Sequence, residues 1–176
     1  MNRYVKLVGS FLVATVLITL FVNSSNSRAQ TETPTENQLN MIAYRCSTMK
    51  TTITQMQTQD AVTRVELGTN YESMLTKLMT PMNSRLANNQ LDAGSLLTIT
   101  ADFSNSLNSF RQHYSSYDQS ISDLLDIDCA KKPAQFYDKL QTARAKRSLV
   151  QADSAKLSQD IKSYREELKL VTLKVN

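Results

Sequence analysis

Glycine, proline, histidine and tryptophan are scarce in this sequence of 176 residues, which holds three glycines, three prolines, one histidine and no tryptophan. So few glycines leave little material for hairpins, tight turns or phosphate-binding loops, which depend on backbone conformations that glycine adopts most easily. Segments that alternate Val, Ile or Thr with polar residues between turn signals are also missing after residue 30. The sequence therefore predicts an all-α fold of long helices with few connections.

Catalytic motifs are also lacking. His113 is the only imidazole, and no second histidine or cysteine stands at metal-ligand spacing from it. There is no Gly-x-Ser-x-Gly elbow, phosphate loop or dinucleotide fingerprint. Neighbouring carboxylates, such as Glu166 and Glu167, point to different faces of a helix and are typical of solvated charges. We therefore expect no enzymatic activity, no metal and no cofactor, with His113 at the surface or at its boundary.

The first 29 residues have the three parts of an export signal. Arg3 and Lys6 form a basic start, residues 7–22 are an uncharged apolar run, and small residues precede a plausible cut after Ala29. The run is slightly long for a signal peptide and short for a membrane span of about 20 residues. Two alternatives therefore stay open: cleavage after Ala29, or retention of residues 1–29 as an anchor that contacts the membrane through residues 7–22.

Both alternatives place the chain after residue 30 outside the cytoplasm, because the positive charges stay inside. We expect a periplasmic or cell-surface location. The chain after the expected cut is nearly neutral, with 17 basic against 16 acidic residues. Its charge therefore gives no reason to expect a nucleic-acid partner.

Three segments carry apolar residues at alternating three- and four-residue spacing, which is typical of helices packed in a coiled-coil-like seam. After a flexible lead-in at 30–35, we expect one helical domain over 36–176, with helices at about 36–87, 95–127 and 133–174. A short connection joins each helix to the next. These features predict an elongated antiparallel three-helix bundle, a hairpin with a third helix beside it.

The segment 36–87 changes phase, and the sequence leaves open whether it is one helix or two. Its apolar stripe meets the polar Asp60 and Thr63 and then resumes in a new register. Pro81 should kink the helix or end it nearby. The predicted stripe comprises Leu39, Ile42, Cys46, Met49, Ile53 and Met56, followed by Val65, Gly68, Tyr71 (or Glu72), Leu75, Leu78 and Met82.

The other two helices have cleaner stripes. Arg147 and Ser154 are the two polar interruptions of the last one, and polar residues in such seams often fix the register. The stripe of 95–127 comprises Leu96, Ile99, Phe103, Leu107, Phe110, Tyr114, Tyr117, Ile121 and Leu124. That of 133–174 comprises Phe136, Leu140, Ala143, Arg147, Val150, Ser154, Leu157, Ile161, Tyr164, Leu168 and Val171, and Val175 continues it.

Local signals set the expected helix ends. Thr35 and Gln38 form a weak capping box at the start of the first helix. Residues 88–94 form a polar loop, after which Ser95 is a candidate N-cap. Pro133 suits the first position of the last helix.

The two cysteines provide a test of the hairpin. Cys46 lies about 44 residues before the loop, or about 66 Å of helix, and Cys129 lies about 39 residues after it, or about 58 Å. A hairpin therefore brings them to nearly the same height. In an oxidising compartment we expect a structural Cys46–Cys129 disulfide rather than a redox-active pair or free thiols.

Two further groups of side chains have a structural and a functional interpretation. The aromatic row Phe103, Phe110, Tyr114 and Tyr117 could line a ligand groove, although its heptad spacing favours core packing. Met74, Met79 and Met82 could form an adaptable binding patch, but again core packing is favoured, since Met74 and Met82 share a helix face.

Charge is unevenly distributed along the chain. Residues 30–128 hold 6 bases and 11 acids, whereas residues 129–176 hold 11 bases and 5 acids. The simpler interpretation is that the basic last helix packs beside Asp118, Asp123, Asp126 and Asp128. The alternative is contact with an anionic lipid or wall polymer. The basic cluster comprises Lys131, Lys132, Lys139, Arg144, Lys146 and Arg147.

These features favour a non-catalytic structural or protein-interaction module of a bacterial-type cell envelope, acting through a protein partner or self-association, with no small-molecule substrate. The alternative is a periplasmic holdase-type chaperone that clasps unfolded clients between its helices. A chaperone should leave an apolar stripe unused, whereas here three helices account for the stripes.

Overall fold

The computed structural model describes residues 33–175. The expected signal or anchor segment, residues 1–29 with its apolar run 7–22, lies outside the described residues, as do residues 30–32 of the lead-in. The helices are α1 (Glu36–Tyr44), α2 (Cys46–Ser73), the π-helix η1 (Met74–Met79), α3 (Thr80–Asn88), α4 (Gly94–Leu125) and α5 (Pro133–Val175). Residues 33–175 contain no strand, which confirms the all-α class.

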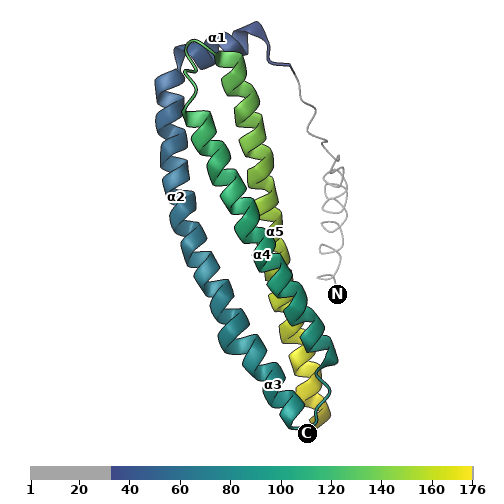
Figure 1. Cartoon of the computed structure of the whole chain (residues 1–176). Helices are drawn as coiled ribbons and strands as arrows, with labels where there is room; N and C mark the ends of the chain where they lie inside the picture. The colour runs from purple at the N-terminus through teal and green to yellow at the C-terminus, as the bar shows by residue number, and fades with distance from the viewer. Residues whose placement is uncertain (1–32, 176) are drawn as a thin grey trace, which may run out of the picture. The chain divides into compact units, whose positions relative to one another are not determined.

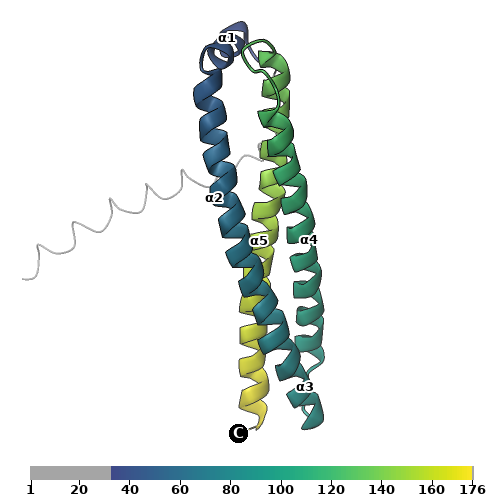
Figure 2. The ribbon, with the colours of Figure 1, turned by 60° about the vertical axis from the view of Figure 1, so that its left-hand side comes forward.

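The long helices run side by side in alternating directions (Figures 1 and 2). α4 packs along α5, α2 packs on α4, and the short α1 crosses one end of the molecule and packs on α5. Residues from Pro34 onward form one compact unit. None of the helices in the described part of the chain is long and apolar enough to cross a membrane.

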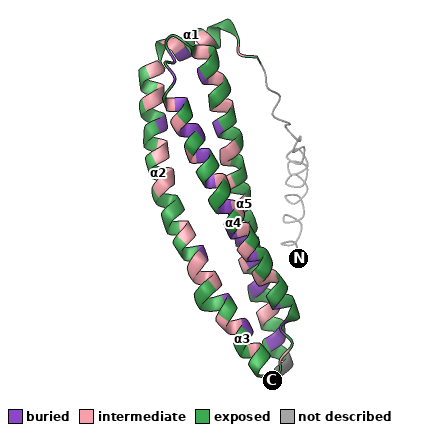
Figure 3. Ribbon diagram, in the orientation of Figure 1, coloured by how far each residue is buried: buried purple, intermediate pink, exposed green. Residues whose placement is uncertain are grey.

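The stripes predicted for the last two helices are confirmed. In α4 every stripe residue is buried except Ile99, which is half-buried, and in α5 the stripe residues up to Val171 are buried or half-buried. Figure 3 shows the buried residues recurring along the length of α4. α5 begins at Pro133, whose fixed φ suits the first turn of a helix.

The first helical segment is interrupted at a place that the sequence did not indicate. Arg45 (φ −98°, ψ 15°) separates α1 from α2, so the phase change at Asp60 is not a break. The capping box at the start of α1 is present: Thr35 Oγ1 accepts from the Gln38 N–H, and Gln38 Oε1 accepts from the Thr35 N–H. The stripe from Leu39 to Met56 is buried or half-buried, as predicted.

The second half of that stripe was partly wrong. Val65 and Leu78 are exposed, at 57% and 63%, and Met79 and Asn83 are buried instead. For Leu78, Met79 and Asn83 the cause is η1, because the wider turns of a π-helix advance the register by one residue. Val65 precedes η1 and is exposed because the polar Asp60 and not a new apolar phase faces the other helices. Pro81 lies two residues after the end of η1, and the helix continues through it to the end of α3.

The turn between α3 and α4 lies where the sequence places it, but its cap differs. Ser95 is not the N-cap, since α4 already begins at Gly94. The Gly94 N–H donates to Asp92 Oδ1 at 3.0 Å. Within the turn Gln90 adopts a left-handed conformation, with φ 58°.

Candidate functional site

A disulfide joins the two cysteines across the end of the molecule near α1. Cys46 is the first residue of α2, and Cys129 lies in the turn between α4 and α5. Their Cα atoms are 5.4 Å apart although 83 positions separate them in the sequence. Cys129 is fully buried in the apolar core that lies at this end. The disulfide thus closes the open end of the hairpin, as the helix lengths predict.

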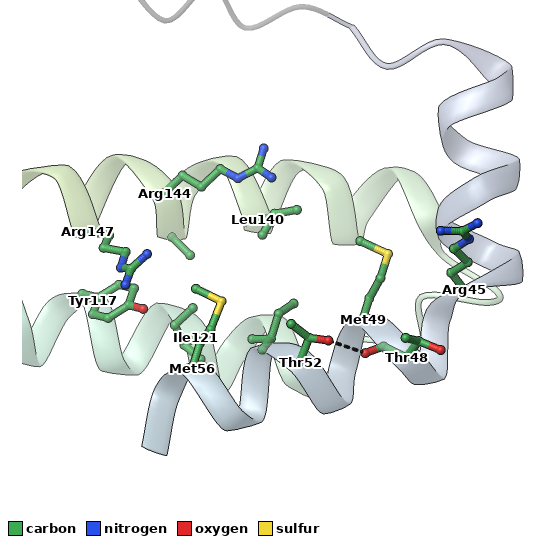
Figure 4. Close-up of a pocket in the computed structure, with 12 residues that line it drawn as sticks. Arg45, Thr48, Met49, Thr52, Met56, Tyr117, Ile121, Leu140, Arg144 and Arg147 are labelled. Carbon is green, nitrogen blue, oxygen red and sulfur yellow. Dashed lines mark hydrogen bonds between the residues drawn. The ribbon is translucent and has the colours of Figure 1, made fainter. Parts of the chain in front are cut away.

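Beside the disulfide, α2, α4 and α5 enclose a groove of about 360 Å³, which we call the disulfide-end groove. In Figure 4, Tyr117 and Arg147 lie at one end of this groove and Arg45 at the other, with Met49 and Met56 reaching into the space between α2 and α5. The lining residues are Arg45, Thr48, Met49, Thr52, Ile53, Met56, Tyr117, Ile121, Leu140, Ala143, Arg144 and Arg147.

Three polar side chains from three helices meet where this groove ends. Asp60 Oδ2 accepts a hydrogen bond from the Tyr117 hydroxyl at 2.7 Å, and Asp60 Oδ1 accepts one from Arg147 Nη2 at 3.1 Å. Burial, and next the hydrogen bond to Asp60, raises the pKa of Tyr117 far above its usual value. The polar interruptions of two predicted stripes, Asp60 and Arg147, are therefore partners across the molecule.

Two more grooves follow along α5, farther from the disulfide. A middle groove of about 250 Å³ lies between α2 and α5 over the rings of Phe110, Tyr114 and Tyr117. A far groove of about 350 Å³ lies between η1–α3 and α5. All three grooves lie between α5 on one side and α2, η1 and α3 on the other, and we call them together the seam. The far groove is lined by Met74, Lys77, Leu78, Met79, Pro81, Met82, Arg85, Ile161, Tyr164, Arg165 and Leu168.

The aromatic row and the group of three methionines contribute both to the core and to the seam. The aromatic row is buried in α4, as core packing predicts, yet three of its rings also form the floor of the middle groove. The Arg64 guanidinium lies over the Tyr114 ring, 4.8 Å from its centre. Met79 is buried, whereas Met74 and Met82 are half-buried and line the far groove.

The basic cluster does not assemble as one unit. Arg147 pairs with Asp60, and Lys146 Nζ donates to the carbonyl oxygen of Ser116 at 3.2 Å. Lys131 pairs with its near neighbour Asp128 at 3.5 Å. The other three members, Lys132, Lys139 and Arg144, have no acidic partner within residues 33–173.

Two of the four acidic side chains expected beside this cluster have other partners. Asp118 accepts from Gln57 Nε2 of α2 at 3.0 Å, and Asp123 accepts from Gln119 Nε2 at 2.8 Å. Asp118 faces α2 rather than α5. Of the expected acids, only Asp128 pairs with a member of the cluster. Contact of the cluster with an anionic surface stays a prediction.

Buried polar side chains at the far end were missed by the sequence patterns. Asn83 Nδ2 donates to Thr100 Oγ1 and Asn83 Oδ1 accepts from the Tyr164 hydroxyl, both at 2.8 Å. Asp160 is buried as well, and it accepts from Ser106 Oγ at 3.1 Å and from Lys156. An apolar period carries no signal for such residues, because they face the core with their polar atoms satisfied.

His113 lies half-buried between α4 and α5, where its Nδ1 is 2.6 Å from Asp153 Oδ2. The pair links the two helices through one hydrogen bond. Among the described side chains, no three His, Cys, Asp or Glu residues are placed to hold a metal ion.

Comparison of the chain with models of protein families, with curated proteins and with solved structures finds no match.

Proposed function

We propose that this chain is a non-catalytic, exported protein-interaction module of the cell envelope, built as an elongated three-helix bundle. The observation that carries the proposal is the seam. α2 has its main contacts with α4. Its side that faces α5 is joined to α5 by the Asp60–Arg147 ion pair and carries the disulfide-end and middle grooves, and the far groove continues them between η1–α3 and α5. Apolar side chains with a polar rim are typical of protein-binding surfaces.

An exposed apolar side chain adds to this surface. Leu78 is exposed at 63% and lines the far groove, which three methionines also line. Methionine is flexible and polarizable and therefore adapts to the shape of a partner. Other large apolar side chains are exposed on α2 and α5 outside the linings of the three grooves: Val62, Val65, Leu149, Leu170 and Leu173.

The disulfide supports export. Disulfides persist in oxidising compartments outside the cytoplasm, and Cys46 and Cys129 are joined in one. The signal-like composition of residues 1–29 agrees with this location. Cell fractionation with N-terminal sequencing of the native protein tests it, and a cytoplasmic protein with an intact N-terminus would contradict it.

A holdase chaperone is the second candidate, and the seam also favours it. The apolar pattern indicated no unused stripe, but apolar side chains of α2, η1 and α5 are accessible in the three grooves. A chaperone would bind many unfolded clients there, whereas an interaction module would bind one partner or a second copy of itself.

Photo-crosslinking in the native envelope separates these candidates. A photoreactive amino acid at Leu78 samples the far groove. Leu97 is the matched control, because it is similarly exposed, at 54%, and lies on α4 away from the three grooves of the seam. We expect Leu78 to give one discrete product that Leu97 does not give, and sedimentation velocity to show whether it contains two copies of the chain.

Two results would contradict the proposal. A broad range of products at Leu78, together with suppressed aggregation of several unrelated clients, would identify a holdase. Equal products at Leu78 and Leu97, or none at either position, would show that the seam is not a binding surface.

A further inference from the structure

The disulfide-end groove has an uneven distribution of charge. Arg45, Arg144 and Arg147 line it, and no acidic residue does. Asp60 neutralises Arg147 from beyond the groove. Arg45 and Arg144 are exposed and have no acidic partner among residues 33–173. Two of the three guanidinium groups are thus available to an anion.

The interior of this groove is apolar. Met49, Met56 and Leu140 are half-buried there, and Ile53 and Ile121 form buried walls on α2 and α4. Figure 4 shows both methionine side chains directed into the space between α2 and α5. An alkyl chain would find apolar contacts on three sides, and the flexible methionines would adapt to its path.

The size of the groove suits a small ligand. Its volume of about 360 Å³ lies in the range of small-molecule sites. A single alkyl chain therefore fits inside the groove.

We propose that the disulfide-end groove binds a single-chain anionic amphiphile, with its alkyl chain between Met49, Met56 and Leu140. The anionic head contacts Arg144 and Arg45 at the rim. Carboxylate and phosphate heads share this chemistry, since guanidinium groups pair with both. This binding does not depend on a protein partner at the far groove.

Isothermal titration of the natively exported protein tests the proposal, with dodecanoate and dodecyl phosphate below their micelle concentrations. Dodecyltrimethylammonium has the same chain and the opposite charge, so it is the ligand control. We expect saturable 1:1 binding of one or both anions and none of the cation. From octanoate to dodecanoate the affinity should rise about fourfold per CH₂.

Arg144→Gln should weaken binding about tenfold, because it removes a charge-assisted contact. Lys139→Gln is the matched control, since it removes an unpaired positive charge from the same helix outside the groove lining, and it should leave the affinity unchanged. Circular dichroism confirms that both variants are folded. The proposal is overturned by equal losses in the two variants, by equal binding of the cation, or by an acidic helical peptide that binds where neither anion does.

Discussion

Replacing Asp60 should destabilise the protein through its buried partner rather than through its ion pair. Tyr117 is 2% exposed, and its hydroxyl donates to Asp60 Oδ2 at 2.7 Å. A buried donor without an acceptor costs about 1–3 kcal/mol. The side chain of Arg147 is 40% exposed, so its pairing with Asp60 contributes at most about 0.5 kcal/mol. We therefore expect Asp60→Ala to lower the free energy of unfolding by about 2 kcal/mol, or roughly 4–8 °C in Tm.

Urea unfolding followed by far-UV circular dichroism measures this loss. Asp60→Asn keeps one acceptor oxygen and should lose about half as much. Asp102→Ala is the matched control, because this exposed carboxylate on α4 has no hydrogen-bond partner in the described part of the chain, and it should stay within about 0.5 kcal/mol of wild type.

A double-mutant cycle with Tyr117→Phe isolates the hydrogen bond itself. We expect a coupling free energy of at least about 1 kcal/mol between positions 60 and 117. If the two substitutions were additive, or if Asp60→Ala cost no more than Asp102→Ala, the hydroxyl would have another acceptor and the reasoning would be refuted.

Three further predictions concern other parts of the fold. Reduction of the disulfide should lower the free energy of unfolding by about 4–5 kcal/mol, because it opens a loop of 83 residues, and urea titration with and without reductant measures the change. Asn83→Ala should cost about 1–2 kcal/mol in the same assay, since it removes the hydrogen bonds of Asn83 with Tyr164 and Thr100 while the Tyr164 hydroxyl keeps the Met79 carbonyl oxygen as an acceptor, whereas Asn89→Ala in the exposed turn should cost less than about 1 kcal/mol. Burial is the leading cause that raises the pKa of Tyr114, Tyr117 and Tyr164 above the ordinary 10.0, so the stability they confer is fully present below pH 10 and is lost as the pH rises through their higher folded values. Tyrosinate absorbance should therefore show these three ionising together with the loss of helix, and independent ionisation at pH 10 in the folded protein would contradict their burial.

The helices α4 and α5 could be read from the sequence because their apolar residues keep one period from end to end. Phe103 to Leu124 and Phe136 to Val171 face the core at the predicted positions. The cysteine pairing followed from the expected oxidising compartment and from the helix rise, because the two arms between the loop and the cysteines are nearly equal.

The α1–α3 segment could not be read in this way. The break at Arg45 has no proline or glycine to signal it, and η1 shifts the register without any change in composition. Leu78 was therefore assigned to the core, and Asn83 was left out of it. Val65, which precedes η1, was assigned to the core because the polar Asp60 was taken as a change of phase.

The seam could not be predicted from the sequence either. Every apolar residue along it belongs to a predicted stripe or lies next to one, so the pattern accounted for it as core. Whether α2 closes against α5 or only against α4 depends on packing in three dimensions. The pairing of Asp60 with Arg147 also depends on three-dimensional packing. The sequence shows each residue as a polar interruption of its stripe, but it does not show that the two are in contact.

The account depends on the chain folding back so that the start of α2 lies beside the turn between α4 and α5, which holds the grooves in place. Peptide mapping of the natively purified protein, without reduction and with alkylation of free thiols, tests this directly. We predict one linked pair of peptides that contains Cys46 and Cys129. Two separate alkylated peptides would contradict the disulfide, the oxidising location and the closure of the disulfide-end groove.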